Sequence, residues 1–307
     1  MTPAPLPTFI VFGEALTDFV RIGEHDWRSI AGGACWNVAR VAAKLGVPTG
    51  WAGAVSEDVF GRDIVERSRS VGLDMRFVQT VTAPPLLAMV HQLDPPRYFF
   101  LGEGAADLCF DESKLPADWE QACALAHFGG ISLVRPGLGE RLIGIAERLH
   151  AQGVRIVFDP NYRDLMGPDY PALFERMARL ASLLKVSDED LARIYPVLDT
   201  TQALAHLRRL APQALLMYTH GARGMNLHMP ERRIDQAAFA VDVVDTVGAG
   251  DACVGGFVAS WLLRPERSWP AHLRFAAATA ALACTQAGAH APTRAQVEAL
   301  LADRAEA

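Results

Sequence analysis

A glycine-rich turn followed by an acidic residue carries the clearest chemistry in this sequence. Gly248, Ala249 and Gly250 follow a valine-rich segment at 241–245, which favours a strand, and open a segment with helical spacing. Small residues let backbone N–H groups approach an anion, and the free amides of a helix start favour negative charge. Asp251 in the first turn would repel a resting phosphate, so we interpret it as a general base. It would take the proton from an alcohol that attacks a phosphoryl group held by those amides.

Two other interpretations of this turn compete with the first. An aspartate in a first helical turn is also an ordinary helix-start residue, and for Asp251 taken alone that role is favoured. A dinucleotide-binding turn would need a glycine where Cys253 stands, and it normally follows the first strand of its unit. The sequence has no GxxxxGK[ST] segment, which excludes a P-loop phosphate site.

A second glycine turn lies near the N-terminus and also precedes a helical pattern. Gly32 and Gly33 would expose backbone amides, and Asn37 offers both a donor and acceptors. These features suit a ligand with many hydroxyl groups. Taken alone, however, a Gly-Gly turn before a helix is usually only a turn.

Strand and helix patterns alternate through most of the chain and predict the frame that positions these turns. Short apolar runs separated by segments of helical spacing are typical of βαβ units, so we expect a parallel sheet covered by helices on both faces. We expect strands at 9–12, 49–55, 124–128, 154–158, 183–186 and 214–219. We expect helices at 35–45, 58–71, 138–150, 172–180, 202–210, 249–263, 271–285 and 294–302.

Two stretches break this alternation. Residues 19–30 and 86–100 have β patterns without intervening helices, and the segments 86–93 and 97–101 predict a hairpin with its turn at 94–96. Such strands form a small separate sheet, used as a lid over an active site or as a dimer contact, or they extend the edge of the main sheet. The residues alone leave these alternatives open.

Composition limits the class of protein and its partners. Half of the 307 residues are apolar, and 35 acidic against 29 basic residues give a formal charge of −6. Such a chain can bury a large core, and its acidic balance argues against a nucleic-acid partner. Five scattered cysteines without a CxxC pair fit reduced thiols. The sequence shows neither a secretory signal nor an apolar run that could span a bilayer, so we expect a cytoplasmic protein without a membrane partner.

Taken together, the two glycine turns resemble the paired motifs of the ribokinase-like (PfkB) carbohydrate kinases. The first motif is Ala31-Gly32-Gly33 with Asn37, and the second runs from Asp245 to Asp251. The similarity extends over nearly the whole chain and is nearest to the fructokinase and 2-keto-3-deoxygluconate kinase branch. It includes the segments 13–19, 103–107, 159–163, 219–224 and 285–292.

This resemblance implies a three-layer αβα sandwich in one domain over 1–307, with a mostly parallel sheet and a small β-sheet lid near 17–31 and 84–102. It implies transfer of the γ-phosphoryl group of ATP to a sugar hydroxyl, with Mg²⁺ accompanying the nucleotide and K⁺ as a further cation. The acceptor that it favours is fructose; 2-keto-3-deoxygluconate and other sugars are the alternatives. We also expect a homodimer through an apolar outer face of the lid.

The resemblance also implies a role for each group of site residues. Asp251 would be the base, and the three residues before it the anion hole. The sugar would be held by Asp18, Gly32, Gly33, Asn37 and Arg163; the nucleotide by Lys185, Ser187, Thr219, Gly221 and Gly224; a monovalent cation by Asp245, Thr246 and Ala289; and Mg²⁺, through water, by Asp190.

Several positions depart from the family pattern. Ser187 and Asp190 stand where relatives often have an Asn-x-x-Glu motif, and Ala277 stands where an adenine-contacting asparagine is frequent. Cys35-Trp36 replaces a common Pro-Ala pair, so Trp36 either narrows the sugar pocket or packs under the lid. These departures leave a sugar-binding sensor with weak transfer activity as an alternative. The complete turn before Asp251 favours the enzyme.

Overall fold

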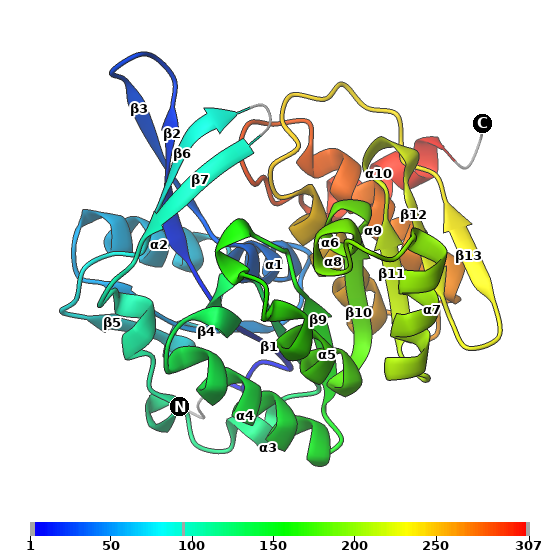
Figure 1. Ribbon diagram of the computed structural model, residues 1–307, viewed down its shortest axis with the longest axis horizontal. Coiled ribbons are helices and arrows are strands. Elements are labelled where there is room, and N and C mark those ends of the chain that lie inside the picture. Colours follow the sequence, from blue (N-terminus) through cyan, green and yellow to red (C-terminus); the bar gives the residue numbers. More distant parts are fainter. Residues whose placement is uncertain (1–3, 94–95, 305–307) are drawn as a thin grey trace.

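A nine-stranded sheet with helices on both faces forms the centre of the molecule (Figure 1). The computed structural model describes residues 4–93 and 96–304. The strand order is β13-β12-β11-β10-β9-β8-β1-β4-β5. All pairs from β5 to β11 are parallel, and β12 and β13 continue the sheet in antiparallel fashion. The predicted α/β class with a mostly parallel sheet is therefore confirmed.

The bounds of these elements agree with most of the expected segments. The strands of the sheet are β1 (Phe9–Phe12), β4 (Thr49–Ser56), β5 (Val78–Val81), β8 (Leu125–Gly129), β9 (Arg155–Asp159), β10 (Ala181–Ser187), β11 (Leu215–Thr219), β12 (Met225–His228) and β13 (Arg233–Gln236). The helices are α1 (Ala34–Lys44), α2 (Val59–Ser70), α3 (Trp119–Ala122), α4 (Leu138–Ala151), α5 (Tyr170–Leu180), α6 (Asp188–Ile194), α7 (Thr200–Leu210), α8 (Ala249–Leu263), α9 (Trp269–Ala283) and α10 (Arg294–Asp303).

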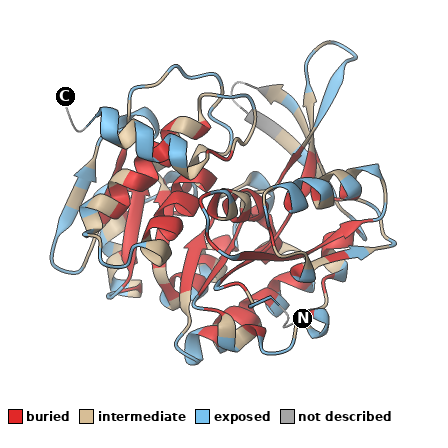
Figure 2. Ribbon diagram, turned by 180° about the vertical axis from the view of Figure 1, so that it is seen from behind, coloured by how far each residue is buried: buried red, intermediate tan, exposed pale blue. Residues whose placement is uncertain are grey.

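Alternate side chains of the strands supply two separate cores, one on each face of the sheet. Ile10 and Phe12 belong to the core that α4, α5 and α7 cover, whereas Phe9 and Val11 belong to the core under α1, α8 and α9. All four side chains of β1 are buried, which explains why the sequence of this strand is a continuous apolar run. Figure 2 shows this burial concentrated in the sheet and on the inner helix faces. No helix in the described part of the chain is long and apolar enough to cross a membrane.

A second, four-stranded sheet projects from one end of the sandwich (Figure 1). Its order is β3-β2-β6-β7, with β2 and β6 parallel and the outer pairs antiparallel. The alternative of an edge extension of the main sheet is therefore wrong. Residues 94–95 of the predicted hairpin turn lie outside the described residues. The strands are β2 (Leu16–Arg21), β3 (Trp27–Gly32), β6 (Leu87–Leu93) and β7 (Pro96–Leu101).

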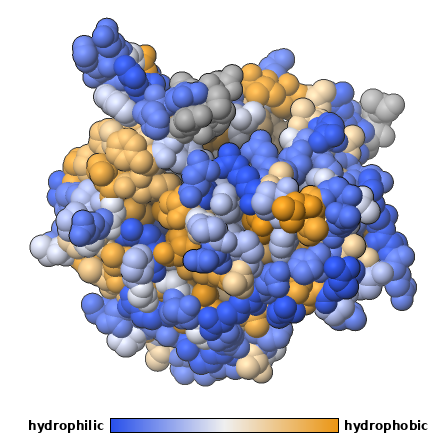
Figure 3. Space-filling view, in the orientation of Figure 1, coloured by the Kyte–Doolittle hydropathy of each residue, from blue (hydrophilic) through white to orange (hydrophobic). Residues whose placement is uncertain are grey.

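The predicted strand at 241–245 is wrong. Irregular backbone leads from Ala237 into α8, and Val243 and Val244 are 62% and 63% exposed. Figure 3 shows apolar surface where this loop lies. The N–H groups of Val244 and Asp245 both donate to the carbonyl of Cys284, just after α9. The end of a helix does not present the alternating backbone donors and acceptors of a strand edge. The valine-rich segment at 241–245 therefore forms no β-sheet hydrogen bonds here.

Candidate active site

Most of the predicted site residues gather where parallel strands end, at the carboxyl edge of the main sheet. Asp159 ends β9, Ser187 ends β10 and Thr219 ends β11. The start of α8 lies at the same edge, because the Nζ atom of Lys185 is 3.3 Å from the position that a Cβ on Gly250 would take. Ligands of open α/β sheets bind in the crevice outside this edge.

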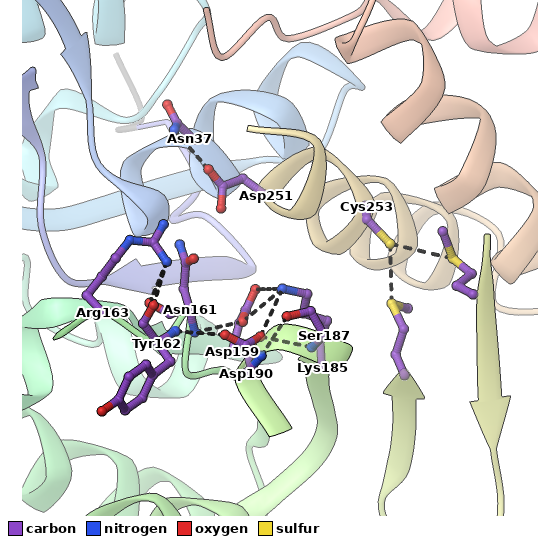
Figure 4. Close-up of polar contacts among 12 residues, drawn as sticks. Asn37, Asp159, Asn161, Tyr162, Arg163, Lys185, Ser187, Asp190, Asp251 and Cys253 are labelled. Carbon is purple, nitrogen blue, oxygen red and sulfur yellow. Dashed lines mark hydrogen bonds and ion pairs between the residues drawn. The ribbon is translucent and has the colours of Figure 1, made fainter. Parts of the chain in front are cut away.

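Asn37 and Asp251 form the central pair of the site, although 214 positions separate them in the chain. The Nδ2 group of Asn37 on α1 donates to Oδ2 of Asp251 on α8 at 2.9 Å (Figure 4). Burial raises the pKa of Asp251 to about 7, opposed by the Asn37 hydrogen bond, while Asp159 raises it further and Lys185 and Arg163 lower it. A carboxyl group that titrates near neutrality is suited to accept a proton from a hydroxyl.

The turn before Asp251 exposes backbone donors. Gly248 has a φ of 78°, and a Cβ there would lie 2.7 Å from the Cβ of Ala289, so this position requires glycine. The amide of Ala249 donates to the carbonyl of Thr246 at 3.2 Å. Within the described residues, the amides of Gly250 and Asp251 have no partner on the chain, as expected in the first turn of a helix. These two N–H groups are free to bind an anion.

A buried cluster of Lys185, Asp159 and Asp190 lies beside this turn. Lys185 is 5% exposed, and its Nζ lies 3.1 Å from Oδ2 of Asp159 and 3.8 Å from Oδ2 of Asp190. Burial alone would lower the pKa of Lys185, but Asp159 and Asp190 outweigh it and the pKa is raised. Lys185 therefore carries a fixed positive charge, and this charge attracts the carboxylate of Asp251. The described residues contain no group of three or more His, Cys, Asp or Glu side chains that could hold a metal ion.

The residues predicted to hold the sugar lie around the junction of the second sheet with α1. A Cβ on Gly32 would come within 2.4 Å of Oδ2 of Asp18, so glycine leaves room for this carboxylate. Burial raises the pKa of Asp18 to about 6, and Arg163 opposes the rise. Figure 4 shows the guanidinium of Arg163 reaching toward the Asn37–Asp251 pair. Gly33, with φ of 113°, passes within contact of the Glu14 backbone and begins α1.

Asp190 and Ser187 form a tight helix start rather than an open pair of ligands. The Ser187 hydroxyl accepts from the Asp190 amide at 3.0 Å, and Oδ2 of Asp190 accepts from the Ser187 amide at 2.8 Å. The other carboxylate oxygen of Asp190 accepts from the amide of Tyr162 at 2.9 Å. Asp190 thus holds the loop that carries Arg163, and both of its oxygens are already engaged.

The remaining predicted residues lie in the turn after β11, in the loop before α8 and in the loop after α9. The N–H of His220 donates to the carbonyl of Gly224 at 2.9 Å, and that of Gly224 donates to Gly221 at 3.0 Å, which closes a compact turn after Thr219. Gly224 cannot carry a side chain, because a Cβ would lie 2.2 Å from the carbonyl oxygen of Gln236.

Asp245 connects the anion-binding turn to the C-terminal loop. Its Oδ1 accepts from the amide of Val247 at 3.0 Å and its Oδ2 from that of Gly288 at 2.7 Å. Thr246 is next in the chain and exposed, and the carbonyl of Ala289 accepts from Arg40 at 3.2 Å. The three residues predicted for a monovalent cation therefore border one turn, and each engaged oxygen keeps a second lone pair.

Sequence reasoning missed the roles of several polar residues and left Trp36 undecided. Glu14 is 3% exposed and accepts from both the amide and the hydroxyl of Ser132. Asp159 is the main partner of Lys185. Glu14 follows the buried strand β1 and Asp159 is the last residue of β9, positions that mark the ligand edge of a parallel sheet. Trp36 is fully buried and donates to the Ser68 hydroxyl at 2.8 Å, so it packs against α2 and does not narrow the predicted sugar pocket.

A carboxylate beside free helix-start amides, at the carboxyl edge of a parallel sheet, is the arrangement of a phosphoryl-transfer site. The chain belongs to the pfkB family of carbohydrate kinases, whose family model matches residues 8–296. It is 32% identical to a fructokinase of Rhizobium leguminosarum bv. trifolii over 81% of this chain and 78% of that protein. The resemblance noted in the two glycine turns is thereby confirmed, and the protein is a sugar kinase.

Solved structures agree in fold and extent. A fructokinase from Xylella fastidiosa with bound ATP superposes with a TM-score of 0.86 at 28% identity, covering 98% of this chain and 100% of that one. An aminoimidazole riboside kinase from Salmonella enterica, complexed with aminoimidazole riboside and an ATP analog, gives a TM-score of 0.81 at 28% identity, with 95% and 99% covered. The ribokinase-like three-layer fold is confirmed.

Proposed function

We propose that this chain transfers the γ-phosphoryl group of ATP to a hydroxyl group of fructose. The observation that carries the proposal is the Asn37–Asp251 pair beside the free amides of Gly250 and Asp251. The fructokinase relatives and the ATP-bound fructokinase structure support both the acceptor and the donor.

The charges around the acceptor space favour a neutral sugar over a sugar acid. Glu14, Asp18 and Asp251 are all close enough to Arg163 for its charge to affect their pKa values. The Nη1 group of Arg163 donates to two carbonyl groups of its own loop, at 2.8 and 3.0 Å. Lys185 is paired with buried aspartates. A carboxylate or phosphate on the acceptor would therefore meet Asp18, Asp251 and one partly engaged guanidinium, so fructose is favoured over 2-keto-3-deoxygluconate.

In the proposed reaction, Asp251 receives the proton of the attacking hydroxyl group. A bond forms between that oxygen and the γ-phosphorus, the bond from the γ-phosphorus to the β–γ bridging oxygen breaks, and ADP leaves. The Gly250 and Asp251 amides stabilise charge on the transferred group, and Lys185 adds a fixed positive potential. Asp18, Gly32, Gly33 and Asn37 orient the sugar.

Cations complete the proposed site. Mg²⁺ would accompany ATP and would neutralise phosphate charge, and Asp190, whose oxygens already accept backbone hydrogen bonds, would act on it through water. Asp245, Thr246 and Ala289 would hold a monovalent cation such as K⁺, since their oxygens are hard ligands. The nucleotide lies along Lys185, Ser187, Thr219, Gly221 and Gly224. Turnover in K⁺ should exceed turnover in tetramethylammonium, and equal rates would remove the monovalent site from the proposal.

We place this activity in the cytoplasm and in a homodimer whose contact is the outer face of the lid, formed by the four strands of the small sheet. All five cysteines are free thiols, which fits a reducing compartment. The register places Asp18 on the face toward the site and Phe19 on the opposite face, together with Trp27, Phe99 and Leu101. These last three side chains are 38%, 51% and 51% exposed. They form an apolar surface that supports contact with a second copy of the chain.

An acceptor panel tests the proposed function directly. Coupled ADP release would be measured with fructose, ribose, 2-keto-3-deoxygluconate, tagatose 6-phosphate, aminoimidazole riboside and adenosine, with ATP, Mg²⁺ and K⁺ present. Fructose should give the highest kcat/KM. Higher kcat/KM with another acceptor would overturn the assignment of fructose, and no release above the acceptor-free rate with any of them would overturn the proposed transfer.

A further inference from the structure

Arg40 on α1 is a partly buried charged residue that the proposed reaction does not use. Its guanidinium stacks on the ring of Trp36 at 4.4 Å, and Trp36 is fixed in turn by Ser68. Burial lowers the pKa of Arg40 to about 10. Its Nε is buried without a hydrogen-bond partner in the described chain. A buried N–H donor without a partner costs stability, so the placement of this side chain needs a reason.

The Nη1 group of Arg40 reaches two parts of the site. It donates to Oδ1 of Asn37 at 3.4 Å and to the carbonyl of Ala289 at 3.2 Å. A guanidinium only donates, so the group that faces it must accept. If the Asn37 amide turned by half a rotation, its NH₂ would face the guanidinium, and its oxygen would face the carboxylate of Asp251. Both contacts would then be repulsive.

We propose that Arg40 is a positioning residue, which holds the Asn37 amide in the orientation in which Nδ2 donates to Asp251. Its second contact holds Ala289 against Gly248, at the start of the anion-binding turn. One guanidinium thereby fixes both the residue that donates to the base and the loop that contacts the anion-binding turn. The inference rests on the proposed function, in which Asp251 accepts the proton.

The consequence lies in the pH dependence of turnover. A donor that always faces Asp251 stabilises its ionised form, which is the form that works as a base. Without Arg40 the Asn37 amide is free to turn, and ionised Asp251 loses its donor for part of the time. The pH at which turnover falls to half its maximum on the acid side therefore rises. Other groups face these side chains and stay in place: Asp159 on β9, Arg163 after it, Lys185 on β10 and Cys35 on α1 around Asp251; Asp63 and Arg67 on α2, and His290, around Arg40.

The test compares three variants of the full chain, Arg40→Met, Arg40→Gln and Arg40→Lys. For each, kcat and kcat/KM for fructose would be measured from pH 5.5 to 9 by coupled ADP release. Met offers no donor, and Gln can accept as well as donate, so both should raise the acid midpoint by about half a pH unit or more. Their kcat should fall roughly tenfold with the sugar KM within threefold. Lys only donates and should keep the wild-type midpoint. A wild-type midpoint in Arg40→Gln would overturn the inference.

Loss of a positive charge also raises the pKa of a nearby carboxyl group, so a double-mutant cycle separates the two causes. In an Asn37→Ala background, Arg40→Met should shift the midpoint by less than a third of its shift in the wild type. An undiminished shift would mean that Arg40 acts through its charge alone and would overturn the positioning role. If Arg40→Met fails to fold, Arg40→Gln takes its place in the cycle.

The proposed function has a separate test. If Asp251→Asn keeps wild-type turnover, the assignment of the base fails, whatever Arg40 does. If that variant loses turnover while all Arg40 variants keep the wild-type pH profile, only the role of Arg40 fails.

Discussion

Replacing Asp251 by asparagine should lower activity and raise stability in the same protein. Asparagine has nearly the same size and can still accept from Asn37, so the change removes mainly the ionisable group. Loss of a general base lowers kcat by a factor on the order of 10² to 10⁴. Because the sugar is held mainly by other residues, its affinity should change little. Coupled ADP release with fructose at pH 8 measures the first part of this prediction.

The gain in stability follows from the burial of the same carboxyl group. Asp251 is 7% exposed, and its pKa rises from 3.8 to about 7 on folding, which corresponds to roughly 4 kcal/mol. A raised carboxyl pKa means that ionisation destabilises the folded state. This penalty is absent below pH 3.8, grows as the pH rises, and is complete above about pH 7. The melting temperature of Asp251→Asn should therefore exceed that of the wild type by roughly 5 to 8 °C at pH 8.

The pH dependence of this gain separates the explanation from a general effect of the substitution. At pH 4 the two proteins should melt at nearly the same temperature. Asp242→Asn provides a matched control, because Asp242 is an exposed aspartate on the loop before α8 and should change neither turnover nor melting. Turnover of Asp251→Asn within threefold of the wild type would refute the role of the base, and an equal gain in stability at pH 4 and pH 8 would refute the electrostatic reasoning.

Three further changes test the acceptor site, the ion cluster and the lid. In Gly32→Ala the new Cβ would displace the carboxylate of Asp18, 2.4 Å away, so the KM for fructose should rise on the order of 10- to 100-fold while that for ATP stays unchanged. Lys185→Met leaves Asp159 without its buried partner and should lower the free energy of unfolding by about 3–5 kcal/mol in urea titrations. Phe99→Asp on the outer face of the lid should convert a dimer to a monomer in light scattering after gel filtration.

Each of these changes has a matched control elsewhere in the chain. Gly144→Ala adds a Cβ into open space, Lys114→Met removes an exposed lysine, and Val197→Asp places a charge on an apolar side chain that is already 89% exposed. None should have the corresponding effect. An unchanged fructose KM in Gly32→Ala, a loss under 1 kcal/mol in Lys185→Met, or an unchanged mass in Phe99→Asp would contradict the respective argument.

Local patterns were sufficient to predict the elements that have simple periodicity and clear ends. The helix at 249–263 follows directly from the glycine turn and the apolar residues after it, and α8 has these bounds. The strand expected at 241–245 shows the limit of such reasoning. Its valines have strand composition, but strand formation depends on a neighbouring edge, and the nearest partner here is the carbonyl at Cys284.

Residues far apart in sequence determine the electrostatics of the site, which local patterns do not contain. The presence of Asn37 and Asp251 in one site was implied only by a family resemblance, and neither their hydrogen bond nor the pairing of Lys185 with Asp159 was expected. The orientation of Trp36 depended on whether Ser68 of α2 would lie within reach. Such contacts follow from the order of strands in the sheet and from helix packing, so they require the tertiary structure.

The small sheet is assembled from two separate parts of the chain. β2 and β3 form one hairpin and β6 and β7 another, and the parallel pairing of β2 with β6 joins them. Removing either hairpin would leave the other as an isolated two-stranded ribbon with an unpaired inner edge, which is marginally stable in water and prone to aggregate. The proposed lid therefore requires both insertions at once, and moving it to another scaffold would mean grafting two segments in register rather than one.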